Sequence, residues 1–182
     1  MAKTCTTEKT ANRQRWIEKG LLELMQENKF ENITVTDLCQ HLDLPRRSFY
    51  RYFHDMEDVL DSLLHNTFQE MAIAKGKLTI GMLEKYYDFW FHQKDLLSAL
   101  AYSGMHSKVS QYALKYTDSE WMKEYLAAEE FGMDLDNEMN LFVISGLSSL
   151  LISWHAEGFQ KTPGQMARIA YRMLSKPLLM HT

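Results

Sequence analysis

The chain has 182 residues, of which 46% are hydrophobic, enough for one ordinary domain or for a small domain joined to a larger one. Its formal net charge of −4 excludes a uniformly basic nucleic-acid-binding surface and leaves room only for a local basic cluster. Only three prolines and eight glycines interrupt the chain, which favours long helices over a β fold with many turns.

Two helices are expected in the first part of the chain. Apolar residues recur at helical spacing on one face of residues 10–28. Residues 29–32 are expected to form a loop. Thr34, followed three residues later by Asp37, is expected to cap a second helix over residues 35–42.

A tight turn and a third helix follow. Asp43–Leu44 forms the turn, and Pro45 suits the first turn of the next helix because its missing N–H is not needed there. This helix is predicted to continue through Phe53, with Phe49, Tyr52 and Phe53 on its packed side. Asp55 is expected to cap the helix after it.

The rest of the chain predicts longer helices near residues 56–75, 80–92, 94–101, 105–117, 119–130, 136–158 and 163–176. Gly158 is expected to end one of them and Thr162-Pro163 to start the last. The pattern therefore predicts an all-α protein.

Signals for secretion, membrane insertion, metal binding and catalysis are not found. The N-terminal segment has no apolar core, and the apolar run Leu141–Trp154 is shorter than the roughly 20 residues of a membrane span. The two cysteines have no metal spacing, and Cys39 is expected to be a buried free thiol. No HExxH, GxSxG or phosphate-binding glycine loop occurs. We therefore expect a cytoplasmic protein that is not an enzyme, with no catalytic residue, metal or cofactor.

Twelve residues between Trp16 and Leu64 carry a family pattern without a gap: Thr34, Val35, Asp37, Leu38, Cys39, Leu44, Ser48, Phe49, Tyr50, Phe53, Glu57 and Leu60. In this pattern the chain resembles the DNA-binding domain of the TetR family of bacterial transcriptional regulators. The later residues Phe142, Gly146, Trp154, Gly158-Phe159, Thr162-Pro163 and Met166 resemble the Firmicutes branch related to dihydroxyacetone-kinase regulators. The resemblance implies a three-helix helix-turn-helix DNA-binding domain over residues 1–55. A helical ligand-binding and dimerisation domain would follow over residues 56–182.

Three positions depart from the family pattern. Asp43 replaces the usual glycine of the turn and can adopt a left-handed backbone at modest cost. Arg47 replaces a small residue in the recognition helix and would enlarge the contact with bases. Met56 replaces a lysine that contacts a phosphate, so one phosphate contact is in doubt.

The resemblance places the third helix in the major groove. The guanidinium groups of Arg46 and Arg47 can each donate two hydrogen bonds to guanine O6 and N7. Such a contact is worth about 1–3 kcal/mol of discrimination against the wrong base. Ser48 and Tyr50 resemble phosphate contacts. The full expected DNA-binding set is Thr34, Thr36, Arg46, Arg47, Ser48, Tyr50, Arg51, Tyr52 and His54. Each assignment has an alternative. The arginines and His54 could be ordinary solvated surface residues, Tyr50 could be a buried structural residue, and Tyr52 could pack in the core.

In the C-terminal half the resemblance implies a ligand pocket and a dimer interface. The aromatic residues expected to line the pocket for a small apolar or aromatic effector are Tyr86, Phe89, Trp90, Tyr102, Tyr112, Trp121 and Trp154. Aromatic residues at helical spacing are also typical of an ordinary core. The residues expected at the homodimer interface of the last two helices are Leu141, Ser145, Ser148, Ser149, Ile152, Ile169 and Met173.

Together these features predict a regulator that binds a double-stranded DNA operator with inverted-repeat symmetry. We expect a repressor that a small molecule releases from the operator. The alternative is a co-activator-type member whose C-terminal domain is controlled by a partner protein rather than by a metabolite.

Overall fold

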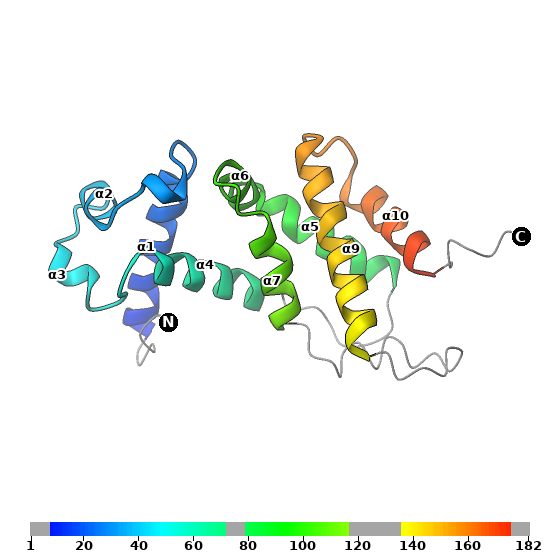
Figure 1. The fold of residues 1–182 in the computed structure, drawn as a ribbon, viewed down its shortest axis with the longest axis horizontal. Helices are drawn as coiled ribbons and strands as arrows, with labels where there is room; N and C mark the ends of the chain where they lie inside the picture. The colour runs from blue at the N-terminus through cyan, green and yellow to red at the C-terminus, as the bar shows by residue number, and fades with distance from the viewer. Residues whose placement is uncertain (1–7, 72–78, 117–135, 176–182) are drawn as a thin grey trace, which may run out of the picture. The chain divides into compact units, whose positions relative to one another are not determined.

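The computed structural model describes residues 8–71, 79–116 and 136–175, and all regular structure within these ranges is helical (Figure 1). The all-α prediction is confirmed. The helical segments are α1 (Glu8–Leu24), the 3-10 turn η1 (Phe30–Asn32), α2 (Val35–His41), α3 (Arg46–Phe49), α4 (Met56–Glu70), α5 (Ile80–His92), α6 (Lys94–Tyr102), α7 (Ser107–Tyr116), α9 (Asp136–Ala156) and α10 (Pro163–Ser175). The helix predicted at residues 119–130 lies outside the described residues. Within the described ranges, no helix combines the length and apolar character needed to cross a bilayer.

The contacts divide the chain into two compact units. Unit 1 contains the residues up to Glu70 together with Ser98–Met105, and unit 2 contains Met71–Leu97 and the residues from His106 onward. Helix α4 therefore belongs to unit 1 by its contacts, and α6 is divided between the two units. The domain boundary expected between residues 55 and 56 falls at the start of α4 and stays a prediction.

In unit 1, α1 packs against both α2 and α4. The side chains of Ile17, Leu21 and Leu38 are fully buried in this core. Gly20 allows the end of α2 to approach α1, because a Cβ at this position would lie 2.6 Å from the nearest side-chain atom of Leu42. The close approach fixes α2 against α1 and thereby positions the turn that follows α2.

A buried carboxylate joins α1 to α4. Glu18 accepts hydrogen bonds from Ser62 Oγ at 2.6 Å and from Asn66 Nδ2 at 3.0 Å. These two donors replace the water that the carboxylate loses on burial. The contact couples α1 to a helix more than 40 residues later in the chain.

In unit 2, α5 packs against α10 and α7 packs against α9. Trp154 of α9 is almost fully buried and packs against Tyr87 of α5, with ring centroids 5.6 Å apart. Its Nε1 donates to the carbonyl of Lys161 at 2.9 Å, which fixes the turn between α9 and α10. The aromatic packing thus also defines where α10 begins.

The end of α9 confirms the predicted role of Gly158. Gly158 has φ of 70°, and its N–H donates to the carbonyl of His155 at 2.9 Å. The N–H of Phe159 donates to the carbonyl of Trp154 at 3.0 Å, and the two rings contact each other at 4.8 Å. This pair of bonds and the apolar contact form a Schellman motif.

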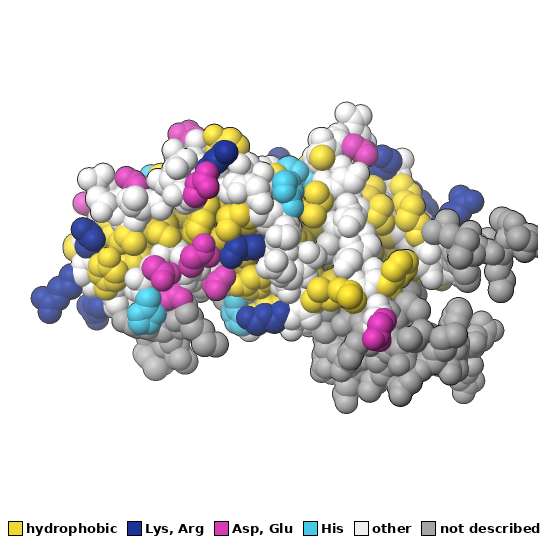
Figure 2. Space-filling model, in the orientation of Figure 1, with side chains coloured by type: hydrophobic (Ala, Val, Ile, Leu, Met, Phe, Trp, Pro, Cys, Tyr) yellow, Lys and Arg dark blue, Asp and Glu magenta, His cyan; other side chains and the backbone are white. Residues whose placement is uncertain are grey.

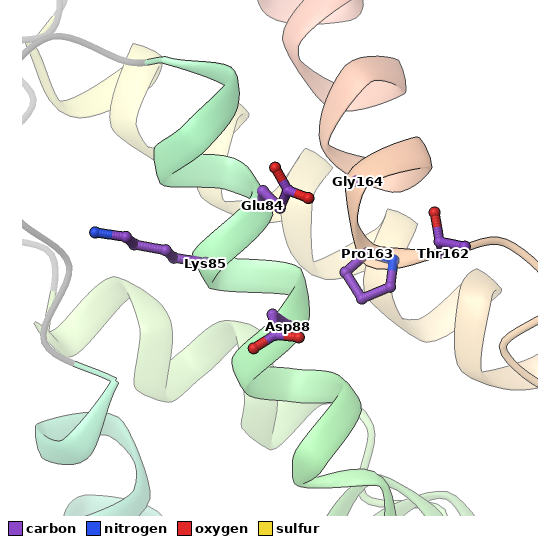
Figure 3. Close-up of a pocket in the computed structure, with 6 residues that line it drawn as sticks. All are labelled: Glu84, Lys85, Asp88, Thr162, Pro163 and Gly164. Atoms are coloured by element: carbon purple, nitrogen blue, oxygen red, sulfur yellow. The ribbon is translucent and has the colours of Figure 1, made fainter.

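The start of α10 is satisfied within the protein. Thr162 N donates to Gln165 Oε1 at 2.8 Å, and Gln165 N donates to Thr162 Oγ1 at 3.2 Å, which is a capping box. Glu84 of α5 points toward Gly164, where a Cβ would lie 2.7 Å from the Glu84 carboxylate (Figure 3). A polar cavity of about 310 Å³ lies beside this contact. Glu84 therefore supplies a negative charge at the positive end of the α10 dipole.

Candidate nucleic-acid interface

The turn between α2 and α3 has the left-handed residue that was predicted. Asp43 has φ of 45°. Its N–H donates to the carbonyl of Gln40 at 3.2 Å, and the N–H of Leu44 donates to the carbonyl of Cys39 at 2.8 Å. The bonds form a Schellman motif with aspartate in the place that glycine usually takes. The buried side chain of Leu44 then secures the turn to the core.

The predicted cap of α2 is confirmed. Thr34 Oγ1 accepts from Asp37 N at 3.2 Å, and the Asp37 carboxylate accepts from both Thr34 N and Thr34 Oγ1, at 2.8 and 2.6 Å. The hydrogen bonds from Thr34 lower the pKa of Asp37. Because both donors of Thr34 are directed to Asp37, the geometry gives Thr34 a capping role. Its contact with DNA stays a prediction.

Helix α3 is shorter than predicted. It ends at Phe49, and residues 50–52 continue as turns rather than as a helix through Phe53. Two side-chain hydrogen bonds are made where the chain leaves α3. The Tyr52 carbonyl accepts from Nε2 of the buried Gln14 at 3.5 Å. Asp55 already caps α4 by accepting from Asp58 N at 2.9 Å, which confirms the predicted cap.

The short helix presents its polar side chains to solvent. Phe49 and Phe53 are fully buried and hold the segment against the core. Arg46, Arg47 and Arg51 are exposed, and Figure 2 shows Lys and Arg side chains (dark blue) gathered over α3. The arrangement is that of a positively charged, rigidly anchored helix-turn-helix surface.

Tyr50 is accessible rather than structural. It is 43% exposed, which excludes the alternative of a buried Tyr50. Arg46 Nη2 donates to Tyr50 Oη at 3.5 Å, so the two side chains position each other one turn apart. No such interaction is described for Arg47, whose fork remains available.

Every residue of the expected DNA-binding set is at least partly accessible. Ser48 and Tyr52 are half-buried, and the others are exposed: Thr34, Thr36, Arg46, Arg47, Tyr50, Arg51 and His54. Gln14 was missed by the sequence reasoning. The signal for it was a polar side chain on the apolar face that also holds Ile17 and Leu21.

The unusual backbone at Asp43 gives a testable expectation. We expect Asp43→Gly to raise the free energy of unfolding by about 0.5–1 kcal/mol, because glycine adopts a positive φ without a Cβ penalty. Urea denaturation of the full chain measures the change. Asp43→Asn is the matched control, because asparagine removes the charge but keeps a side chain at the same position. An equal gain for Asn and Gly would assign the effect to charge and contradict the backbone explanation.

The aromatic residues expected to line a ligand pocket do not share one environment. Tyr86, Trp90 and Trp154 are buried in the packed core of unit 2. Phe89 and Tyr112 are half-buried, and Tyr102 is 52% exposed and belongs to unit 1. Trp121 lies outside the described residues. The pocket assignment stays a prediction.

Tyr87 is a buried polar residue that was not in the expected set. Its side chain is fully buried, and its hydroxyl has no hydrogen-bond partner among the described residues. Burial raises the pKa of Tyr87, so the side chain remains a neutral phenol. A buried hydroxyl of this kind is a donor and acceptor available to a bound molecule.

We expect Tyr87→Phe to raise the free energy of unfolding by about 1 kcal/mol, because it removes a buried polar atom without a partner and keeps the ring contact with Trp154. Thermal or urea unfolding of the ligand-free protein measures the effect. A loss of stability would show instead that the hydroxyl has a partner such as an ordered water.

The expected dimer residues lie mainly on the outer face of α9 and on α10. Leu141 and Met173 are about half exposed, Ser149 is exposed, and Ser145, Ile152 and Ile169 are half-buried. Ser148 is instead buried, because it lies on the face of α9 that also carries Ile144 and Leu151. Phe142, which was not in the expected set, is the most exposed apolar side chain of this face at 71%.

An apolar groove runs beside these residues. Its volume is about 340 Å³, and it lies between α9 and α10. The residues that line it are Phe142, Gly146, Leu147, Ser149, Leu150, Ala170, Met173 and Leu174. Within the described part of unit 2, an exposed apolar ridge and an apolar groove therefore lie next to each other.

No family model matches the chain. A curated relative, the HTH-type dhaKLM operon transcriptional activator DhaS of Lactococcus lactis, is 30% identical over 89 residues. The aligned part covers 49% of this chain and 42% of the relative, so the match spans less than half of that protein.

Solved structures extend the similarity to nearly the whole chain. The dihydroxyacetone kinase operon activator DhaS has a TM-score of 0.62 at 16% identity, covering 89% of this chain and 93% of that one. A chain assigned to the TetR-family transcriptional regulators from Syntrophomonas wolfei also has a TM-score of 0.62, at 17% identity, covering 94% and 99%. The chain is therefore TetR-like in fold and is related in sequence to the regulator DhaS.

Proposed function

We propose that the protein is a sequence-specific DNA-binding transcriptional regulator that acts as a homodimer in the cytoplasm. The observation that carries the proposal is the exposed basic surface of α3, anchored from below by Phe49 and Phe53. A rigid helix of this kind fits the major groove, where Arg offers two donors to guanine O6 and N7. Arg46 and Arg47 are the proposed base contacts, with Ser48 and Tyr50 at the phosphates.

The proposed homodimer sets the form of the operator. An isologous interface places two recognition helices about one turn of duplex apart, roughly 34–36 Å. The exposed Phe142, Leu141 and Met173 and the adjoining groove support an interface on α9 and α10. The proposed operator is therefore an inverted repeat.

The proposed regulation is release of the DNA by a small apolar or aromatic effector that binds in unit 2. The Tyr87 hydroxyl, which lies in an aromatic core and has no hydrogen-bond partner among the described residues, supports such a site. Under this proposal the protein without effector binds the operator and acts as a repressor.

A second candidate is an activator whose C-terminal unit answers to a partner protein. Two observations favour it. The relative in Lactococcus lactis and the solved DhaS structure are both named as activators. The buried, closely packed Tyr86, Trp90 and Trp154 suit a filled core rather than a metabolite pocket.

Selection of bound sequences from a random duplex library tests the DNA-binding proposal. We expect the full-length protein to enrich one inverted repeat whose half-site centres lie about 10–10.5 base pairs apart. Failure to enrich any sequence would contradict the proposal. Transcription in vitro from a promoter carrying the selected site then distinguishes repression from activation.

A further inference from the structure

A cation on α1 lies outside the expected DNA-binding set. The Arg13 guanidinium carbon lies 3.9 Å from the centre of the Trp16 ring, which is a cation–π stack. Both side chains are half-buried, so the stack restricts the arginine without removing it from solvent. The five N–H donors of a guanidinium lie in its plane, so stacking on one face leaves its donor edge free for an anion.

Two contacts place this stack on the helix-turn-helix side of α1. Arg13, Trp16 and Gly20 share one face of the helix by their spacing, and Gly20 is the residue that meets Leu42 at the end of α2. The neighbouring Gln14 bonds the carbonyl of Tyr52 where the chain leaves α3. The side of α1 that carries Arg13 is thus bounded by α2 and by the exit of the recognition segment.

Arg13 differs from the neighbouring Arg15 in that no ion pair is described for it among the described residues. Arg15 is directed to Glu70, with Nη2 and Oε1 3.9 Å apart. The first turn of α4 carries Glu57 and Asp58 and so offers no cation to a phosphate. Among the described residues, no acidic partner is recorded for Arg13.

We infer that Arg13, held in position by Trp16, is a further contact to the DNA backbone that flanks the major-groove segment read by α3. The inference rests on the proposed DNA-binding function. A phosphate suits a planar, preorganised guanidinium because its oxygens accept two parallel hydrogen bonds. Such a contact positions the protein on the duplex and carries no base specificity.

The test compares DNA affinity across a series of KCl concentrations by fluorescence anisotropy. The full-length wild type and four variants, Arg13→Ala, Arg13→Lys, Trp16→Ala and Arg15→Ala, are titrated with a selected site and with a random duplex. We expect Arg13→Ala to reduce the slope of log K against log [salt] by about 0.9 per protomer. Arg13→Ala should reduce the affinity for the selected site and for the random duplex by the same factor.

The other three variants distinguish the effect of the position of the Arg13 guanidinium from the effect of its charge. Arg13→Lys should keep the slope but bind several-fold more weakly, since lysine lacks the planar fork. Trp16→Ala should weaken binding although the charge remains, because the stack that positions Arg13 is lost. Arg15→Ala removes the same charge from a residue paired with Glu70 and should change affinity by less than about twofold.

The outcomes distinguish this inference from the proposed function. Equal effects of Arg13→Ala and Arg15→Ala, or an unchanged slope for Arg13→Ala, would overturn the role of Arg13 while leaving a DNA-binding protein. If the wild type binds neither duplex, the DNA-binding function itself is wrong and the contact fails with it.

Discussion

Replacing Arg47 with alanine is expected to weaken binding to the selected DNA site by about 1–3 kcal/mol per half-site, roughly 5- to 150-fold. The reason is the geometry of α3. Arg47 is exposed, its backbone is fixed by the fully buried Phe49 two residues later, and no intramolecular contact is described for its fork. A guanidinium group without an intramolecular partner, on a backbone that is already fixed, loses little entropy when it pairs with a base.

Binding to random DNA should fall much less, because non-specific affinity depends on the total number of phosphate contacts. Anisotropy titrations of the selected site and a random duplex at one salt concentration measure both losses. Arg47→Lys is the matched control: it keeps the charge but cannot pair bidentately, so it should retain random binding and lose discrimination. Equal losses on both duplexes would contradict a base-reading role for Arg47.

Arg46 and Arg47 are adjacent in sequence but differ in their surroundings. Arg46 is directed toward Tyr50, and this contact raises the pKa of Arg46. Arg46 and Tyr50 therefore present one cation and one hydroxyl next to each other. This combination suits a phosphate with a neighbouring base edge. Arg47 has no such constraint, so it is the stronger candidate for sequence discrimination.

Local signals in the sequence correctly predicted the cap of α2, the turn after α2 and the end of α9, whereas α1, α3 and α4 end earlier than predicted. The capping box of Thr34 and Asp37, the left-handed Asp43 and the Schellman end at Gly158 each depend on bonds between residues at most five apart. Such bonds form wherever the residue types stand at the right spacing. The caps, and with them the positions of α2 and of the turn into α3, could therefore be read before any tertiary contact was known.

Contacts between segments that are distant in the chain could not be predicted from the sequence. The hydrogen bond at the exit of α3 joins the Tyr52 carbonyl to Gln14, which is 38 residues away in the chain. The buried Glu18 is matched by Ser62 and Asn66 of α4, which no periodicity of α1 indicates. The position of Arg13 follows from the same tertiary packing. The recognition residues could thus be named from the sequence, but not the side chains that position them.

The outer surface of α9 has the mixed character expected of a helix that packs against another copy of itself. Large apolar side chains, Leu141 and Phe142, stand beside the small residues Ser145, Gly146 and Ser149. Small residues allow two helix backbones to approach, and Phe142 lines the adjoining apolar groove. Figure 2 shows hydrophobic side chains (yellow) on both sides of a pale stripe along α9. Among the described residues of a single chain, this apolar surface is left exposed to water.

Phe142→Asp is therefore expected to abolish the proposed homodimer at micromolar concentration, because dimerisation would bury an unpaired carboxylate beside an apolar groove. Loss of the dimer should also weaken binding to the full inverted repeat by about 10²–10⁴-fold, since two linked recognition helices bind with a high effective concentration. Affinity for a single half-site should be nearly unchanged, because α3 is in unit 1 and its anchors Phe49 and Phe53 are not altered.

Sedimentation equilibrium and anisotropy titrations on full-site and half-site duplexes measure the two effects. Ile80→Asp is the matched control, since it places the same charge at another exposed apolar position of unit 2, on α5. This control should leave the dimer intact. A Phe142→Asp protein that remains dimeric would exclude the α9 surface as the interface. A monomeric variant that still binds the full inverted repeat tightly would show instead that each chain recognises DNA without a partner.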